Sequence, residues 1–146
     1  MWETKFSIKT KVNKEVIWKV WSDVENWKEW DKSVEWSSID GRFELGAKGK
    51  LKPKEGPLAK FKLTEVEKFK KFTDEAKLPL TKLQFIHEMN CNNGDTEITH
   101  KIRITGILTF LFSRVIGKKL EKDLPHAMEN LSQVLEKESQ STKNKN

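Results

Sequence analysis

Residues 81–106, TKLQFIHEMNCNNGDTEITHKIRITG, decide the fold, because two runs of alternating apolar and polar residues flank the dipeptide Asn93-Gly94. A two-residue type I′ turn needs positive φ angles at both central positions, and Asn-Gly supplies them. The stretch therefore predicts an antiparallel hairpin. In the register that this turn fixes, His87 lies directly opposite His100.

The apolar face of the hairpin supports this register. With Asn92 opposite Asp95, the partner of Phe85 is Ile102, and the apolar residues of both runs share one face. A shift of one residue would place Lys101 in that position and mix charged with apolar side chains. The pattern thus indicates a hairpin with one buried face.

The residues before the hairpin predict a strand, two short helices and a series of strands. Residues 2–10 alternate as in a half-buried strand, and Asn13 can cap a helix with apolar residues at three- and four-residue spacing. Ser22 and Glu25 form a capping-box pattern for a second helix that ends at Asp31. Glycines and prolines then separate predicted strands near residues 33–40, 43–54, 59–68 and 71–78, before the first hairpin strand at 81–91.

After Gly106 the apolar pattern becomes helical. One stripe is formed by Leu108, Leu111, Phe112, Val115, Leu120, Leu124, Ala127, Leu131 and Val134, which predicts a long terminal helix. Pro125 removes a backbone donor and should kink this helix, and Gly117 should loosen it. We expect one domain over residues 1–136, followed by a polar, mobile tail over residues 137–146.

Composition narrows the class of protein. A chain of 146 residues fits one domain, and 36% hydrophobic residues with 8 Phe and 6 Trp can build a core. We expect a cytoplasmic protein, because no membrane-spanning run and no signal-peptide pattern is present. The single cysteine, Cys91, cannot form an internal disulfide.

The net charge of +6 raises the question of an anionic partner. Only three arginines are present and the lysines are dispersed, so we expect no specific nucleic-acid binding. One group of lysines shares the parity of a strand face: Lys48, Lys50, Lys52, Lys54, Lys60 and Lys62. This face is either the solvated side of a sheet or a weak contact for an anionic membrane.

The order of elements predicts an α+β domain with an antiparallel sheet and helices on one face. The chain resembles the START-like SRPBCC superfamily, specifically its polyketide cyclase/dehydrase and lipid-transport branch. The resemblance covers about residues 2–136 and rests on Val16, Trp18, the stretch Ser22-Asp23-Val24-Glu25-Asn26-Trp27, Trp30-Asp31, Gly41, Gly46, Gly49, Leu51-Lys52-Pro53, Gly56-Pro57, Phe85, His87-Glu88, Thr99-His100, Gly106, Leu124-Pro125 and Leu131.

The resemblance implies a helix-grip fold, in which a curved antiparallel sheet surrounds a long C-terminal helix and two short helices follow the first strand. It also implies a hydrophobic cavity between sheet and helix. Members bind lipids, sterols, polyketides or plant hormones, and some are enzymes. Because one fold carries many functions, the site must be argued from its own residues.

His87 and His100 are the sharpest candidates for site chemistry. Directly opposed residues on one sheet face have Cβ atoms about 5 Å apart, and two imidazoles at that distance do not both carry charge easily. They could line a pocket through hydrogen bonds, or serve as general acid and base in a cyclase or dehydrase. A metal site would need a third ligand, which His126, Glu88 and Glu97 are not placed to supply, so we expect no metal.

Two carboxylates also fall on an apolar parity. If residues 69 and 70 form a turn, Glu65 faces Asp74 and the two could share a proton inside the pocket. Alternatively, a strand end or bulge turns them toward water. The turn contains no glycine, so its register is poorly defined.

Aromatic and aliphatic residues complete the candidate ligand-binding set. Trp27, Trp30 and Trp36 could form a gate at the mouth of the cavity or pack in the core. The full set is Trp30, Trp36, Leu63, Asp74, Phe85, His87, His100, Ile102, Phe112, Ile116 and Leu120.

The sequence therefore predicts a binder, with transport as a further role, of a small hydrophobic molecule such as a lipid, sterol or polyketide. The first alternative is a cyclase/dehydrase enzyme that uses the His pair. The second is an interaction module in which the lysine face and the segment 107–116 contact a membrane or an unidentified protein. No phosphate-binding or dinucleotide motif is present, so we expect no cofactor.

Overall fold

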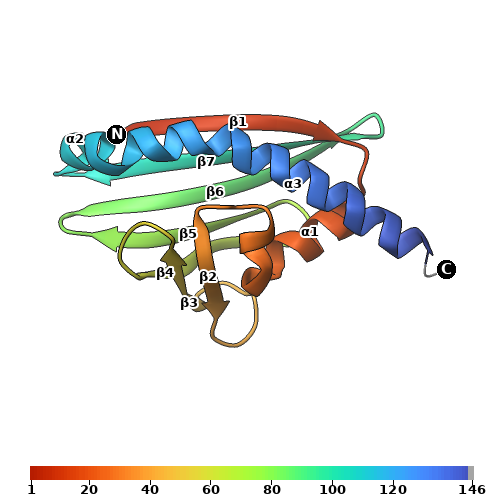
Figure 1. Ribbon diagram of the computed structural model, residues 1–146, viewed down its shortest axis with the longest axis horizontal. Coiled ribbons are helices and arrows are strands. Elements are labelled where there is room, and N and C mark those ends of the chain that lie inside the picture. Colours follow the sequence, from red (N-terminus) through yellow and green to blue (C-terminus); the bar gives the residue numbers. More distant parts are fainter. Residues whose placement is uncertain (145–146) are drawn as a thin grey trace.

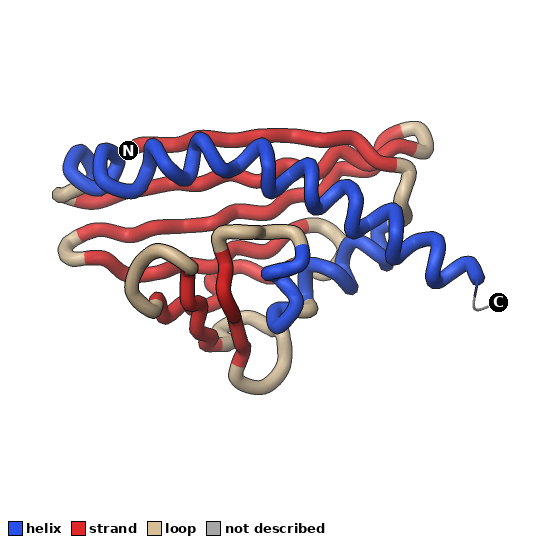
Figure 2. Tube along the Cα trace, viewed as in Figure 1, coloured by secondary structure: helices blue, strands red, loops and turns tan. Residues whose placement is uncertain are grey.

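The computed structural model describes residues 1–144 and consists of one curled sheet with helices on its inner face. The elements are β1 (Trp2–Thr10), α1 (Lys14–Ser22), η1 (Val24–Glu29), β2 (Val34–Ile39), β3 (Lys48–Pro53), β4 (Ala59–Glu67), β5 (Lys71–Leu78), β6 (Thr81–Asn92), β7 (Asp95–Gly106), α2 (Thr109–Phe112), η2 (Ser113–Gly117) and α3 (Lys118–Asn144). The seven strands are antiparallel in the order β1-β7-β6-β5-β4-β3-β2 (Figure 1). Figure 2 shows α3 running along the sheet, with α1 beside its C-terminal part.

The β6–β7 hairpin has the predicted register. Asn92 pairs with Asp95, and the ladder continues through His87 opposite His100 to Thr81 opposite Gly106. The turn residues Asn93 and Gly94 have φ angles of 51° and 85°. The prediction from the Asn-Gly dipeptide is confirmed, because those positive angles are the ones that the type I′ turn requires.

The two short helices begin differently. The Oδ1 atom of Asn13 accepts a hydrogen bond from the Val16 amide at 3.0 Å, so the predicted cap of α1 is confirmed. The second helix is the 3₁₀ helix η1, and the residue at its cap position, Asp23, makes no side-chain capping bond. The predicted Ser22 capping box is wrong, because the Ser22 hydroxyl instead donates to the Lys19 carbonyl at the end of α1.

The strands β3 to β5 depart from the prediction in two places. Residues 40–47 form a loop, with φ of 78° at Gly41 and 87° at Gly46, so β3 begins at Lys48 and not at residue 43. Between β4 and β5, Glu65 pairs with Thr73, and the register shifts at a bulge between Leu63 and Glu65, so that Asp74 pairs with Leu63. The opposition of Glu65 and Asp74 is therefore wrong. The alternative, a bulge that turns the carboxylates toward water, is right for the partly exposed Glu65 and wrong for Asp74, which is buried.

The terminal helical region is interrupted before Pro125. Residues 113–117 form the π-helical turn η2, in which Gly117 is buried against the indole of Trp2. Pro125 lies within α3 and does not end it. Leu111 and Val115, which the sequence placed on the buried stripe, are exposed, so that stripe is not continuous.

The structure does not separate a tail at residue 137. α3 continues to Asn144, and the Nζ atom of Lys19 on α1 lies 2.8 Å from the Oε1 atom of Glu138. The predicted boundary at residue 136 therefore falls inside a helix, and residues 145 and 146 of the predicted tail lie outside the described residues.

The core lies between α3, α1, η1 and the inner face of the sheet. α3 contributes four buried residues at helical spacing, Leu124, Met128, Leu131 and Leu135. Trp21 on α1 is fully buried and packs edge-on against Phe72 of β5, with ring centroids 5.4 Å apart. Large aromatic side chains therefore fill much of the space under the helices.

Candidate functional site

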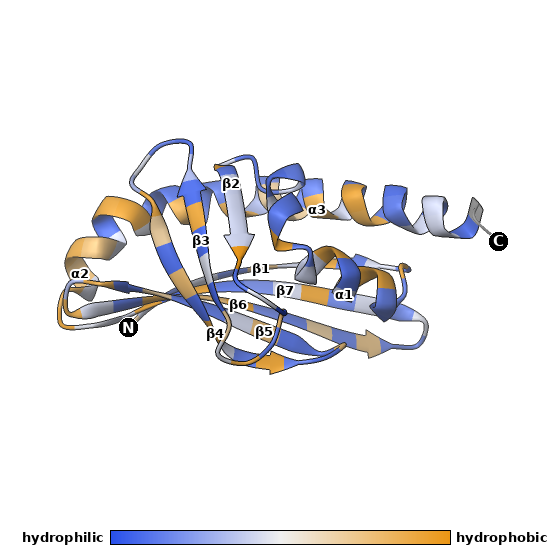
Figure 3. Cartoon of the chain, turned by 90° about the horizontal axis from the view of Figure 1, so that it is seen from below, coloured by the Kyte–Doolittle hydropathy of each residue, from blue (hydrophilic) through white to orange (hydrophobic). Residues whose placement is uncertain are grey.

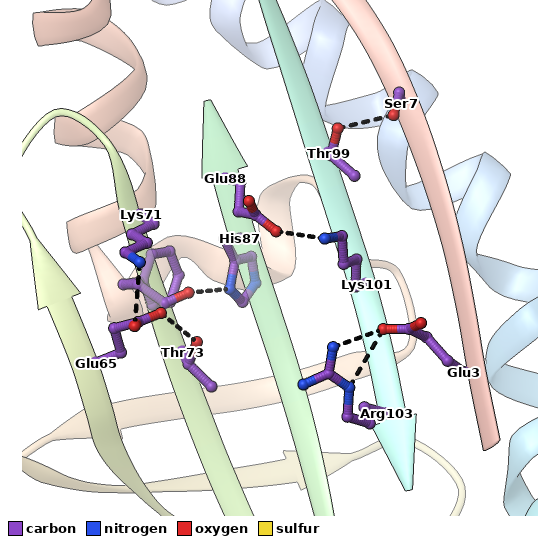
Figure 4. Close-up of polar contacts among 11 residues, drawn as sticks. Glu3, Ser7, Glu65, Lys71, Thr73, His87, Glu88, Thr99, Lys101 and Arg103 are labelled. Atoms are coloured by element: carbon purple, nitrogen blue, oxygen red, sulfur yellow. Dashed lines mark hydrogen bonds and ion pairs between the residues drawn. The ribbon is translucent and has the colours of Figure 1, made fainter. Parts of the chain in front are cut away.

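The centre of the candidate site is the buried pair His87 and His100. Their ring centroids are 4.5 Å apart at an angle of 75°, and the residues are 6% and 4% exposed. The Nδ1 atom of His87 lies 3.2 Å from the carbonyl oxygen of Phe72, as drawn in Figure 4. A carbonyl only accepts, so Nδ1 of His87 donates this bond and its Nε2 is left as an acceptor.

Burial keeps both imidazoles neutral. It lowers the pKa of His87 to about 3, against the weaker opposing effect of hydrogen bonds to the backbone at Phe72 and Phe85. The pKa of His100 is well below its ordinary value because of burial and, secondarily, the adjacent His87. The prediction that the two rings lie together is confirmed, and near pH 7 neither carries a charge.

Asp74 on β5 adds a third buried ionisable group. Its Oδ1 atom is 3.9 Å from Nδ1 of His87, which is longer than a hydrogen bond. The pKa of Asp74 is raised to about 8, mainly by burial; a backbone hydrogen bond opposes this rise and the charge of Asp31 adds to it. The carboxyl is therefore mostly protonated at neutral pH, so a neutral acid lies beside a neutral imidazole.

A small cavity of about 70 Å³ adjoins the His pair, between the sheet and α3. Two of its lining residues, His100 and Trp30, have a buried ring nitrogen, Nε2 and Nε1 respectively, without a hydrogen-bond partner within residues 1–144. Asp31 lies at the rim, where its Oδ1 atom accepts from the amide and the hydroxyl of Ser33 at 3.1 Å and 2.6 Å. The lining thus combines apolar side chains with residues that carry such polar atoms.

Burial also raises the pKa of the carboxyl group at the rim of the cavity, Asp31. The hydrogen bonds from Ser33 lower this pKa, and the charge of Asp123 on α3 raises it again. Asp31, which follows η1, and Asp123 on α3 line the same cavity. Their closeness makes this rim a place where a proton or a hydrogen-bond donor is favoured.

The structure brings together about half of the predicted ligand-binding residues. Those that line the cavity are Trp30, Phe85, His87, His100, Ile102 and Leu120. The others lie elsewhere: Trp36 is exposed on β2, Leu63 is fully buried in the core, Asp74 lies behind His87, and Phe112 and Ile116 pack half-buried at the start of the terminal helical region. Trp27, the third candidate for an aromatic gate, stacks on Phe61 in the core.

Six lining residues were not in the predicted ligand-binding set: Asp31, Ser33, Lys101, Asp123, Leu124 and Ala127. Helical spacing from Leu120 could have indicated the three residues on α3, because positions three, four and seven residues later share its face. Asp31 and Ser33 lie in the irregular segment after η1, where no periodicity applies. Their position depends on how η1 packs on the sheet.

The outer face of the sheet is polar. Figure 4 shows Lys101 paired with Glu88, and Arg103 with Glu3, across neighbouring strands, at 2.7 Å and 2.9 Å. An open hollow of about 750 Å³ on this face is lined mainly by charged and polar side chains. It has the character of a solvated surface, unlike the apolar cavity under α3.

Five lysines of the group share one face of β3 and β4, as predicted, whereas Lys54 lies just beyond the end of β3. Lys48 pairs with Lys62 and Lys50 with Lys60 across the two strands, and all four side chains are exposed. Like charges directly opposite each other repel, so this face gains nothing in stability from the arrangement.

Within residues 1–144, no group of three or more His, Cys, Asp or Glu side chains could hold a metal ion. In the same residues, no helix is long and apolar enough to cross a membrane.

Glu65, turned outward by the bulge, pairs with Lys71 at 3.2 Å.

Comparison with known proteins identifies the fold through structure alone. No protein-family model matches the sequence, and no curated protein matches it. A START superfamily protein from Mycobacterium smegmatis superposes with a TM-score of 0.69 at 13% identity, covering 92% of this chain and 97% of that one. The solved structure of Ara h 8.0201 gives a TM-score of 0.68 at 10% identity, with 92% of this chain and 98% of that chain covered.

A third solved structure, protein NE0264 from Nitrosomonas europaea, has a TM-score of 0.74 at 13% identity, with 93% of this chain and 95% of that chain covered. At such identities the comparison concerns the fold and not the activity. It agrees with the expectation of a curved antiparallel sheet that surrounds a long C-terminal helix, with short helices after the first strand. The chain therefore has the helix-grip fold of the START-like proteins.

Proposed function

We propose that this protein binds a small hydrophobic molecule with a polar end, such as a lipid, sterol or polyketide, between the sheet and α3. The observation that carries the proposal is the cavity beside His100. It is lined by apolar residues such as Phe85 and Leu120 and also by His100 and Trp30, whose buried Nε2 and Nε1 atoms have no hydrogen-bond partner within residues 1–144. Binding sites for small molecules combine an apolar lining with a few such polar groups.

The size of the cavity sets a condition on this proposal. Its volume of about 70 Å³ is enough for roughly two water molecules, whereas sites for drug-sized ligands occupy about 300–1,000 Å³. The ligand must therefore displace part of the wall. The segment that can yield is residues 109–120, where Gly117 is buried and the other side chains are half-buried or exposed.

A titration monitored at the histidines tests the proposal. The chain has three histidines, two on the cavity wall and the exposed His126 on α3. When palmitate, cholesterol, a short-chain quinone and an aromatic polyketide are added in turn, we expect one of them to shift the Cε1–H NMR signals of His87 and His100 saturably. The signal of His126 should stay in place.

A matched pair of variants gives this titration its control. Ala127→Phe adds a ring on the cavity side of α3, and His126→Phe adds one at the neighbouring exposed position. We expect the first to weaken binding at least about tenfold and the second to leave it unchanged. Saturable shifts that persist in Ala127→Phe, or the absence of shifts with every compound, would refute binding in this cavity.

The cyclase/dehydrase alternative is favoured by the juxtaposition of the two rings, but the acid-base properties argue against it. A general base works best with a pKa near the operating pH, whereas the pKa of His87 is about 3. If a compound that binds is also converted, His87→Gln should abolish its conversion while binding persists. Conversion at the wild-type rate in that variant would exclude this role for His87.

A further inference from the structure

Several large apolar side chains are exposed together at one end of the molecule. On α2 and η2, Phe110 is 66% exposed and Val115 is 65% exposed, and in the preceding loop Ile107 is 75% exposed. Leu111 and Leu80 add 43% and 69% exposure. Figure 3 shows this end as an apolar block at α2, near the N-terminus. Such a group of exposed apolar residues marks an interaction surface.

Two segments that are far apart in the sequence form this surface. The amide of Ile107 donates to the carbonyl of Leu80 at 3.0 Å, and the amide of Leu108 donates to the hydroxyl of Thr81 at 3.2 Å. The turn between β5 and β6 is thus bonded to the loop that leads into α2. We call Leu80, Ile107, Phe110, Leu111 and Val115 the apolar tip.

Positive charge surrounds the apolar tip. Residues 105–120 contain no Asp or Glu, but they contain Arg114, Lys118 and Lys119. In the other segment, Lys77 and Lys82 flank the stretch Leu78-Pro79-Leu80-Thr81. Lys119 pairs with Glu55, whereas Arg114, Lys118, Lys77 and Lys82 are exposed and have no ion pair among the residues that the structure describes.

We propose that the apolar tip docks on an anionic lipid bilayer. A surface of this kind can place its apolar side chains at the boundary between headgroups and acyl chains, while the surrounding cations meet the lipid phosphates. The charges decide the type of partner, because four exposed cations without an ion pair within residues 1–144, Arg114, Lys118, Lys77 and Lys82, complement a negatively charged membrane surface. The proposal does not depend on ligand binding in the cavity.

The apolar tip is a different surface from the lysine face of β3 and β4. That face presents exposed Lys48, Lys50, Lys60 and Lys62, so any contact that it makes with a membrane is electrostatic alone. The tip adds apolar insertion to charge, and its binding should therefore be weakened but not abolished by salt. Variants on the two surfaces distinguish between them.

Co-sedimentation with vesicles measures the docking. We expect the protein to bind vesicles of phosphatidylcholine and phosphatidylglycerol, and to bind pure phosphatidylcholine at least about tenfold more weakly. The double variant Phe110→Ser/Val115→Ser should bind the anionic vesicles at least about tenfold more weakly than wild type. Both side chains are exposed, so the fold should be retained, and the far-ultraviolet circular dichroism should match wild type.

Two controls leave the tip intact. Leu45→Ser removes a side chain that is 68% exposed, in the loop between β2 and β3, and Lys50→Glu/Lys60→Glu reverses two charges on the lysine face. We expect both controls to bind within about twofold of wild type. The proposal is overturned if wild type fails to bind, if the tip variant binds as wild type does, or if the lysine-face variant shows the larger loss.

A label reports the orientation directly. Cys91 is the single cysteine and is exposed near the β6–β7 turn, at the end of β6 opposite to Leu80. A polarity-sensitive dye at the new cysteine of Val115→Cys/Cys91→Ser should shift its emission to shorter wavelength on anionic vesicles. The same dye on native Cys91 should not shift. Equal shifts at both positions, or a shift confined to Cys91, would contradict docking through the tip.

Discussion

Trp21→Ala should lower the free energy of unfolding by about 3–5 kcal/mol, the range for a large buried aromatic side chain. Trp21 is fully buried, and its ring centroid lies 5.4 Å from that of Phe72 and 5.9 Å from those of His87 and His100. Removing it leaves a large cavity among rings that cannot all move to fill it. Urea unfolding followed by circular dichroism gives the measurement.

Two other tryptophan variants serve as controls for this result. Trp36→Ala removes a ring that is 42% exposed and should cost less than about 1 kcal/mol. Trp21→Phe keeps a ring in place and removes the Nε1 group, which has no partner within residues 1–144, so it should cost less than Trp21→Ala. If Trp21→Ala costs no more than Trp36→Ala, Trp21 does not hold the aromatic core together.

Asp74→Asn should become more stable relative to wild type as the pH rises. The pKa of Asp74 is about 8 in the folded protein and near its ordinary 3.8 when unfolded. Between these values the unfolded chain releases a proton that the folded chain retains, so wild type loses about 1.4 kcal/mol of stability per pH unit. Asparagine has the shape of the neutral acid and carries no such loss.

The measurement compares urea unfolding of the two proteins between pH 5 and pH 8. The difference in unfolding free energy should change in favour of Asp74→Asn throughout this range, by roughly 4 kcal/mol in total. Ala76→Gly, on the same face of β5, is a suitable control because it removes no titratable group. A difference for Asp74→Asn that stays as constant as that of Ala76→Gly would contradict the raised pKa of Asp74.

The histidines act on stability in the opposite direction. The pKa of His87 falls from an ordinary 6.5 to about 3 in the folded protein, so its burial costs stability as the pH falls below 6.5. His100, whose pKa burial also lowers, acts in the same direction as His87, so below pH 6.5 the two histidines together outweigh the opposite effect of Asp74. The three groups together therefore favour a maximum near pH 6.5. Asp74→Asn should move that maximum toward higher pH.

The hairpin at the centre of the site could be predicted from the sequence because local chemistry determines it. Asn93-Gly94 specifies the turn, and the alternation on either side confirms the register, so the contact between His87 and His100 follows. The β4–β5 connection lacks such a signal. Phe69 has a positive φ of 66° in this turn, although it is not a glycine. The bulge next to Glu65 turns that side chain outward, and no residue of the turn predicts the bulge.

The size of the cavity could not be predicted for a different reason. Whether the apolar residues under α3 leave a space depends on how their bulky rings pack against each other. The sequence tells which rings are present, but it does not give the rotamer that each one adopts. Trp27 and Phe43, for example, both pack toward Phe72, with ring centroids 6.1 Å and 5.0 Å away. The aromatic side chains that suggested a ligand pocket thus fill a large part of it.

The π turn at Ser113–Gly117 has a consequence for how the terminal helical region is read as a pattern. A π turn accommodates one extra residue, which rotates every later side chain by about 100° relative to an uninterrupted α-helix. The region therefore has two phases. Before the turn, Leu111 is exposed, and after it, Leu124 is buried. A single helical period fitted to residues on both sides of the turn combines two different buried faces. It therefore predicts that Leu111 and Val115 are buried, although both are exposed.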